Sequence, residues 1–532
     1  MDMQGGIPFF AAARIFSSRS AGLAGSRFTA SRERPIYRKE IIMNKRITAF
    51  LLSALLLLPM TACGESSENT DEPGAAETEL SPEIAEAEAE TEPVISDDLP
   101  ASDFEGYEFA IYNSNPETNT WFTTVHVTAE EDSADAIPAA IFKRNLAVED
   151  RLNIKISEVE QTADQIKNAI ISGDSSFDLT LMQGANIISQ AQAGYLIDLK
   201  TLPHQNFEKP YWDYNAYKQL SICNKLFVCV GDFLTTQIDE TICMFFNKGI
   251  LTDYNLENPY ELVDSGKWTL DKLAEMASVS GNDTNGDGIY DTNDNYGMMS
   301  WRGVFYMFLL NGCGNTLVEK NEEDVPVYTF NSESFINSYE KILNIIHGEK
   351  KIYFDAEKDA NNHRVQEVMF PADQVLFWSE CISWAKALRE MEANFGILPA
   401  PKYDEAQSAY YSCNNGNFFG MSVPVSVSDK ERASIILEAL QSASTQTVLS
   451  AYYDITLKSK YSRDEESAKM VDIIFDSTTY DCSTVYGLGS VKTNIYTMAS
   501  ENNTDIASFY KKQQKALTKT IEKMVAKIQG LD

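Results

Sequence analysis

The alternation of strand-like and helix-like segments early in the chain is the feature that most constrains its fold. Residues 107–114 read as a strand that runs into a polar loop, and residues 133–153 have apolar side chains at helical spacing. The pattern continues with a strand, a short helix and a buried strand, at residues 154–159, 163–174 and 177–184. This order predicts a parallel α/β sheet covered by helices.

Later segments extend the same α/β pattern, and no internal repeat is present. Two strand-like runs are expected at residues 225–233 and 240–251, and a helix capped by Thr269 follows them. The other expected elements are a strand at the end of 364–380, a strand opening 395–404, and helices at 382–394, 426–444, 463–475 and 505–529.

Length and charge limit the class of protein. The chain has 532 residues, which exceeds one ordinary domain, and its 44% hydrophobic content is enough for large packed cores. The net charge of −34 argues against nucleic-acid binding, because phosphate contacts need clustered Lys and Arg.

The amino-terminal region predicts export. Lys45 and Arg46 precede an apolar run, residues 47–59, that is too short for a stable transmembrane span. We therefore expect a signal peptide over residues 43–62. The closing tetrapeptide MTAC resembles the lipobox of bacterial lipoproteins, which implies cleavage before Cys63 and a lipid on that residue. A plain signal peptide followed by a chance Cys is the alternative.

The segments on either side of the signal are expected to lie outside the fold. Residues 1–42 precede a better start at Met43, so we expect an upstream extension from a start site assigned too early. Residues 64–100 hold thirteen Asp and Glu and no Lys or Arg, which is typical of a disordered tether. Residues 63–100 would then be a lipidated Cys and an acidic tether that lifts the folded part off a membrane.

The cysteines do not indicate a metal site. Of eight Cys, seven remain once Cys63 is set aside; no pair has CxxC spacing and no His lies nearby, which argues against zinc. Most are expected to be buried thiols, and the sequence leaves open whether two of them form a disulfide.

Several segments in the middle and at the end of the chain resemble a known family. The segments FFNK, PYELV followed by GKWT, and FGILPAPKYD occur in this order, and ILEALQSASTQ follows near the end. Together they resemble the family 1 extracellular solute-binding lipoproteins of bacterial ABC importers, over most of residues 104–532. The lipobox and the acidic tether suit the same interpretation.

This resemblance implies an α/β, two-lobe, periplasmic-binding-protein-like (type II) fold with hinge-crossing strands. The lobes of such a fold close over a ligand by hinge motion. We expect the crossings near residues 237–246 and 395–400. The lobes are expected at residues 101–240 plus 398–448 and at residues 241–397 plus 449–532.

The resemblance also implies a function. Many members carry mono- or oligosaccharides, which bind through aromatic platforms and polar groups. The expected partners are a small-molecule ligand, the permease subunits of an ABC importer and, through the lipid, the outer face of the cytoplasmic membrane. A monomer is expected.

Polar and aromatic residues at strand ends and crossings are the candidate ligand contacts. By position, Trp378 and then Trp301 best match the family's sugar-stacking aromatics. Glu240, seven residues before Asn247, lies where related sugar binders hold a cleft carboxylate. The other candidates are polar or aromatic residues: Tyr112, Asn113, Gln183, Asn186, Asp232, Asp239, Arg302, Glu380, Tyr411 and Asn414.

Some of these candidates have a structural alternative. Trp378 and Trp301 could equally pack in a core, and Arg302 could equally be a surface ion-pair partner. Trp268 and Trp384 are expected to be core residues.

Residues 281–297 have the ligand spacing of an EF-hand calcium loop, with Asp at the last position in place of the usual Glu. A sensor needs helices on both sides, yet a strand-like run follows, and a dockerin-like module needs two such loops. A structural calcium site, as in related alginate-oligosaccharide binders, is preferred over a bare turn. The candidate ligands are Asp283, Asn285, Asp287, Ile289, Asp291 and Asp294.

Two other function classes stay open. The chain has four His and no HExxH, GxSxG or P-loop motif, but a glycosidase carboxylate pair could hide among its many acids. A secreted glycoside hydrolase is therefore one alternative. A calcium-dependent cell-surface adhesion protein is the other, although its usual repeated modules are not found.

Overall fold

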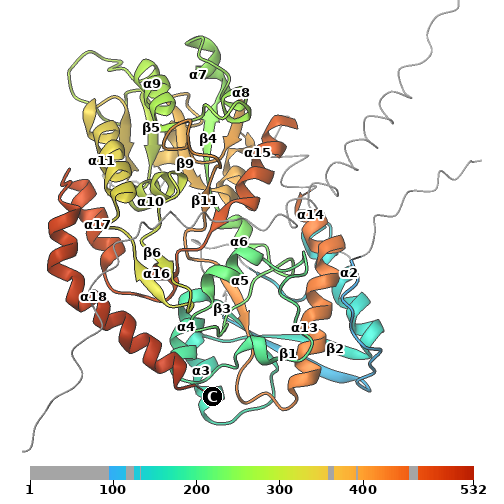
Figure 1. Ribbon diagram of the computed structural model, residues 1–532. Coiled ribbons are helices and arrows are strands. Elements are labelled where there is room, and N and C mark those ends of the chain that lie inside the picture. The colour runs from blue at the N-terminus through green and yellow to red at the C-terminus, as the bar shows by residue number, and fades with distance from the viewer. Residues whose placement is uncertain are drawn as a thin grey trace, which may run out of the picture.

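Two lobes, each built on its own β-sheet, make up the folded part of the protein (Figure 1). The expected upstream extension, the signal peptide, Cys63 and most of the acidic tether lie outside the described residues. None of the described helices is long and apolar enough to cross a membrane. The computed structural model describes residues 95–114, 125–131, 133–356, 365–390, 394–453 and 465–531.

The first lobe contains a four-stranded sheet in the order β12-β3-β1-β2. β1 (Tyr107–Asn113) is parallel to β2 (Ile154–Glu160) and to β3 (Leu179–Gln183), and β12 (Phe419–Ser422) is antiparallel to β3. The strand and helix order predicted for the early chain is confirmed. The helices of this lobe are α2 (Ala136–Leu152), α3 (Ala163–Ile171), α4 (Gly184–Gln192), α5 (Tyr214–Leu220) and α13 (Lys430–Ser444).

Local sequence explains where these first helices begin and end. The Thr162 side chain accepts a hydrogen bond from the Gln165 backbone and Gln165 returns one, a capping box that starts α3. Asn153 adopts a left-handed conformation with φ 51° just past α2, which turns the chain directly into β2.

The second lobe contains a five-stranded sheet in the order β10-β4-β9-β5-β8. β5 (Tyr296–Ser300) is parallel to β8 (Tyr353–Asp355) and β9 (Val375–Cys381), whereas β4 (Ile242–Asn247) is antiparallel to β9 and β10 (Phe395–Leu398). Its helices include α7 (Lys248–Asp253), α8 (Pro259–Asp264), α9 (Leu270–Ser280), α10 (Arg302–Gly312), α11 (Glu333–Gly348), α12 (Val365–Met369) and α15 (Glu465–Asp476).

Three predicted elements differ from the structure. Residues 225–233 are buried but pair only at single points, such as Cys229 with Met421, so they form no strand. The run at 240–251 becomes helix α7 after Asn247, whose side chain caps Ile250. The helix expected at 382–394 is a 3-10 helix over Ile382–Glu390.

Within the residues that the structure describes, three passages between the lobes can be followed. The first passage runs through α6 (Thr236–Asp239) into β4. The second lies between Lys402 and β12, later than the predicted 395–400. Residues directly after β10 stay on the second lobe, because the Lys402 N–H donates to Trp268 O at 3.0 Å. The third follows α13 through the π-helix η4 (Thr445–Leu449) into α14 (Ser450–Tyr453).

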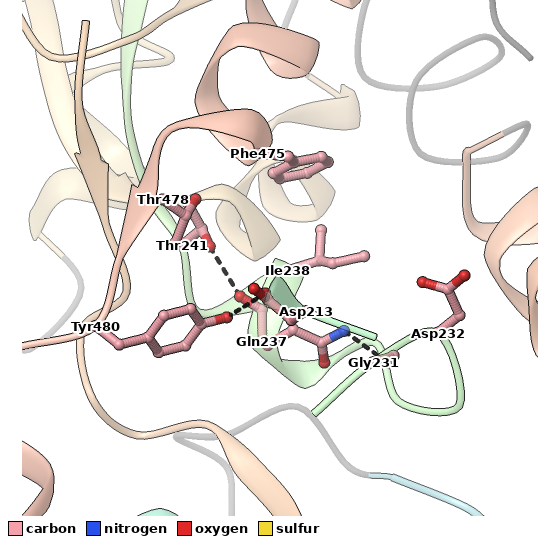
Figure 2. Close-up of a pocket in the computed structure, with 9 residues that line it drawn as sticks. All are labelled: Asp213, Gly231, Asp232, Gln237, Ile238, Thr241, Phe475, Thr478 and Tyr480. Atoms are coloured by element: carbon pink, nitrogen blue, oxygen red, sulfur yellow. Dashed lines mark hydrogen bonds between the residues drawn. The ribbon is translucent and has the colours of Figure 1, made fainter. Parts of the chain in front are cut away.

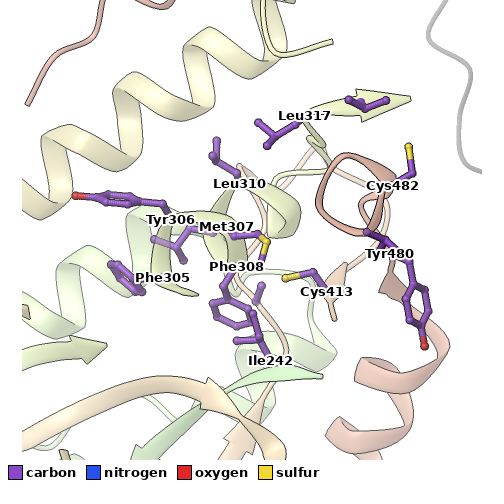
Figure 3. Packing of buried hydrophobic residues seen from close by; sticks show 14 of the residues in the cluster. Ile242, Phe305, Tyr306, Met307, Phe308, Leu310, Leu317, Cys413, Tyr480 and Cys482 are labelled. Atoms are coloured by element: carbon purple, nitrogen blue, oxygen red, sulfur yellow. The ribbon is translucent and has the colours of Figure 1, made fainter. Parts of the chain in front are cut away.

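The carboxyl-terminal helix touches both lobes. α18 (Ile506–Gln529) packs against α4 of the first lobe and against β7 (Pro326–Tyr328), which pairs with β6 (Val318–Lys320). The predicted assignment of the whole terminus to lobe two therefore misses this contact. The largest apolar cluster likewise spans both lobes, since it contains Ile187 of α4 and Phe308 of α10. Figure 3 shows Phe308 with other members of this cluster.

Buried thiols are part of these cores, as the sequence predicted. All seven described cysteines are free, six of them buried and Cys223 half-buried. No disulfide occurs among the residues that the structure describes.

Trp378 lies in the core of the second lobe. Its indole is fully buried, with ring centroids 5.4 Å from Phe245, 5.5 Å from Phe370 and 5.8 Å from Trp384. Trp268 is also fully buried, as expected, and donates to Pro399 O at 3.0 Å. The packing of Trp378 therefore supports the core alternative.

Replacing Trp378 with Ala is expected to lower the free energy of unfolding by about 3–5 kcal/mol, because it empties a fully packed site. Urea denaturation followed by circular dichroism measures the change. Trp301→Ala, at a half-buried position, is the matched control and should cost less. A loss below about 1 kcal/mol for Trp378→Ala would contradict the core assignment.

Candidate functional site

A small recess lies where the first lobe and the first passage meet the end of α15 and the segment after it (Figure 2). Its volume is about 20 Å³, roughly the room that one water molecule needs. The first lobe, the first passage and the late chain each contribute three residues to its lining: Asp213, Gly231, Asp232, Gln237, Ile238, Thr241, Phe475, Thr478 and Tyr480.

A hydrogen bond between Asp213 and Tyr480 joins two parts of the recess lining. Asp213 caps α5 by accepting from the Ala216 N–H at 3.0 Å. Its other carboxylate oxygen accepts from the Tyr480 hydroxyl at 2.8 Å. Tyr480 follows β13 (Thr478–Thr479), which pairs with β11 (Ser412–Cys413), so this bond ties the first lobe to the late chain.

Gly231 and Asp232 shape the wall beside the first passage. A side chain at Gly231 would meet Tyr211 O at 2.4 Å, so the close approach of the two backbones requires glycine. Asp232 is buried and accepts from the Thr445 hydroxyl at 2.7 Å, which connects this wall to the π-helix η4.

Gln237 and Thr241 form the part of the lining that belongs to the first passage. The Gln237 side-chain amide donates to Gly231 O at 2.9 Å and to Leu234 O at 2.8 Å. The Thr241 hydroxyl donates to Gln237 O at 2.8 Å (Figure 2). The recess thus combines hydrogen-bonding groups with the apolar side chains of Ile238 and Phe475, a lining suited to a polar solute with an apolar face.

Three predicted carboxylates are buried beside the first passage. Asp239 accepts from the Tyr452 hydroxyl at 2.7 Å, and Glu240 accepts from the Asn415 side chain at 2.5 Å. Glu380, at the end of β9, accepts from the Cys381 N–H at 3.0 Å. Burial, with a smaller contribution from the charge of Glu240, raises the pKa of Glu380 to about 7.

The predicted candidates on the first sheet lie outside the recess lining. Tyr112 stacks on Phe177 with ring centroids 4.0 Å apart, and Asn113 is buried and donates to Val125 O at 2.8 Å. Gln183 donates to Asn417 at 3.2 Å, and Asn186 is exposed on α4.

The remaining candidates belong to the second lobe and the returning chain. Trp301 is half-buried just before α10, and the side chain of Arg302 lies outside the described part of the structure. Tyr411 is half-buried, and Asn414 is buried and donates to Gln237 O at 2.9 Å.

Of the predicted ligand contacts, the recess lining contains Asp232, and Asn414 bonds to the lining residue Gln237. Sequence reasoning missed the other polar lining residues, notably Asp213, Gln237 and Tyr480. No local motif could have found them, because Asp213 and Tyr480 are 267 positions apart and only the fold brings them together.

The acidic loop lies between α9 and β5, so a strand follows it as predicted. Asp283 accepts from the Gly286 and Gly288 N–H groups, at 2.7 and 2.8 Å. Hydrogen bonds from the backbones of Asp291 and Thr284 hold the pKa of Asp294 below its ordinary value. No group of three or more His, Cys, Asp or Glu among the described residues is placed to hold a metal ion. Calcium binding by this loop stays a prediction.

No protein-family model and no curated protein sequence matches this chain. Solved structures match it in fold. An extracellular solute-binding protein from Staphylococcus aureus in complex with maltose is 15% identical, with TM-score 0.52 over 81% of this chain and 99% of that one.

Two further solved structures have similar scores. A sugar transporter from Rhizobium etli in an open conformation is 13% identical, with TM-score 0.51 over 80% of this chain and all of that one. A cyclo/maltodextrin-binding protein complexed with maltotetraose is 14% identical, with TM-score 0.50 over 81% of this chain and all of that one. This chain therefore has the two-lobe α/β fold of such binding proteins, as its sequence predicted.

Glu380 is expected to make stability depend on pH. The pKa of Glu380 in the folded protein, about 7, lies above the ordinary value of 4.5. The folded state therefore holds this proton more tightly than the unfolded state, and the free energy of unfolding falls as the pH rises from 4.5 through 7. Gln at this position does not titrate. The free energy of unfolding of Glu380→Gln, relative to that of the wild type, should therefore rise by up to about 3 kcal/mol between pH 5 and pH 8. Urea denaturation at several pH values measures this. The exposed Glu261→Gln is the control, and a curve for Glu380→Gln parallel to the wild type would contradict the assignment.

The calcium prediction for the acidic loop can be tested by melting temperature. Calcium added to chelator-treated protein should raise that temperature, since a bound cation offsets the repulsion among the loop carboxylates. A hundredfold excess over Kd corresponds to about 2.7 kcal/mol. Asp283→Asn with Asp287→Asn should abolish the shift, and Asp271→Asn in α9 should keep it. If calcium does not change the melting temperature of the wild type, the loop is a turn that binds no calcium.

Proposed function

We propose that this protein is an extracytoplasmic solute-binding protein that holds a mono- or oligosaccharide in the recess between its lobes. The observation that carries the proposal is the position of the recess. It lies beside the passages that join the two lobes, where such a fold encloses its ligand.

The chemistry of the recess supports a sugar. A sugar ring has apolar faces edged by hydroxyl groups, and it binds through aromatic side chains together with hydroxyl, amide and carboxylate groups. The recess offers Phe475 beside Asp213, Gln237 and Tyr480. Two solved proteins of the same fold are in complexes with maltose and maltotetraose.

Entry of a sugar requires the lobes to separate, because the enclosed space suits about one water molecule. The third passage is suited to a hinge. Val448 packs with Ala140 and Ile141, on α2 of the first lobe, while the next residue, Leu449, packs in the cluster that contains Trp378 of the second. Neighbouring residues of one π-helix thus follow different lobes, and π-turns in helices often occur at functional positions.

Delivery and location form the finer part of the proposal. The lipobox-like segment and the acidic tether support attachment through a lipid on Cys63 at the outer face of the cytoplasmic membrane. The family resemblance supports delivery to the permease subunits of an ABC importer. The proposed role is binding without turnover.

Sugar binding is expected to raise the melting temperature and to give a saturable calorimetric titration. The test panel holds glucose, maltose, maltotriose, maltotetraose and raffinose, and a hundredfold excess over Kd should add about 2.7 kcal/mol to the free energy of unfolding. Sorbitol at equal concentration is the control for non-specific stabilisation by a polyol.

Two results would contradict this proposal. Release of shorter sugars from maltotetraose, followed by chromatography, would instead favour a glycoside hydrolase. The absence of binding to every member of the panel would remove the support for a sugar ligand of this kind.

A further inference from the structure

Gln237 occupies a central place in the recess lining, between Tyr480 and Asp232 in the view of Figure 2. The residue as a whole is 5% exposed. The side-chain nitrogen donates to two backbone carbonyls, of Gly231 and Leu234, at 2.9 and 2.8 Å. These two bonds determine which end of the amide is nitrogen, so the side-chain oxygen is held in the other position.

The main chain of Gln237 is held as firmly as its side chain. The carbonyl oxygen of Gln237 accepts from the Thr241 hydroxyl at 2.8 Å and from the Asn414 side chain at 2.9 Å. In contrast, the side-chain oxygen Oε1 has no hydrogen-bond partner in the described structure. A buried acceptor without a donor is unfavourable and calls for an explanation.

The bonding pattern alone does not mark a binding site. Gln190 on α4 is also buried, with its side-chain nitrogen bonded to Ala163 O at 3.1 Å and to the Met182 sulfur, and its Oε1 likewise has no partner. Gln190, however, does not line the recess. Only Gln237 combines a fixed, unpartnered oxygen with a place in this lining, and that combination carries the inference.

We propose that Gln237 Oε1 accepts a hydrogen bond from a hydroxyl group of the bound solute and thereby selects the solute. The amide cannot turn to offer its nitrogen without breaking both bonds to Gly231 and Leu234. The group that meets Oε1 must therefore be a donor. A sugar hydroxyl satisfies it, whereas an ether oxygen, a carboxylate or a phosphate at the same position places two acceptors in contact. This inference rests on the proposed sugar-binding function and names one contact within it.

The test is calorimetry on the full-length wild type, Gln237→Leu and the control Gln190→Leu. Both variants remove a buried amide of the same type, but only the first changes the recess. For the panel sugar that binds the wild type best, Gln237→Leu should raise Kd about tenfold, the size of one neutral hydrogen bond. Gln190→Leu should leave Kd within about twofold.

Monodeoxy analogues of that sugar separate ligand contact from a structural role. The wild type should bind one analogue about tenfold more weakly than the parent, and Gln237→Leu should bind the two within about twofold. A structural role would instead weaken binding to all analogues alike, and this result would overturn the inference.

The other outcomes are also decisive. If Gln237→Leu fails to fold, the monodeoxy analogues are still measured on the wild type. A wild type that binds every analogue as tightly as the parent sugar overturns the inference. If Gln237→Leu binds as the wild type does, the inference fails while the proposed function stands. If the wild type binds no sugar of the panel, both fail.

Discussion

A short backbone ladder between the lobes is the constraint on which the candidate site depends. Thr241 pairs with Asn414, the Asn415 N–H donates to Glu240 O at 3.0 Å, and the Ile382 N–H donates to Thr241 O at 2.9 Å. These bonds hold the outgoing first passage beside the returning second passage and beside the end of β9. The residues just before the ladder, including Gln237, are therefore buried at the junction of the lobes.

The buried carboxylates near this ladder link the passages to one another. Asp239 of the first passage bonds to Tyr452 at the end of the third passage, and Glu240 bonds to Asn415 of the second. Asp232 of the first lobe bonds to Thr445 at the start of the third passage. Buried charge is unfavourable, as the raised pKa of Glu380 indicates. We infer that these bonds serve the specific arrangement of the passages more than overall stability. Lobe separation would have to rearrange these bonds.

Local periodicity made the strand and helix order of the first lobe predictable, because its elements have their own apolar patterns, and α3 also has a capping box at Thr162. The failures have tertiary causes. Residues 225–233 are apolar enough for a strand, but their described pairing is limited to isolated bridges of Lys225, Cys229 and Gly231, with Ile222, Met421 and Trp212 respectively. The second passage was placed early because FGIL reads as a strand, whereas the contact of Lys402 with Trp268 that keeps the chain on the second lobe has no local signal.

The candidate site was less predictable than the fold, since a large aromatic residue has the same sequence signature in a core and in a cleft. Trp378 illustrates this: neighbouring Phe245, Phe370 and Trp384 enclose it, so its burial follows from three other segments and not from its own. Asp232 could be named because it lies just before the expected first crossing. Asp213 and Tyr480 could not, because their roles arise from a bond across 267 positions. In a fold that forms its site between two lobes, the informative signal is the polar atom whose partner belongs to another passage, or to no described residue at all, as with Gln237 Oε1.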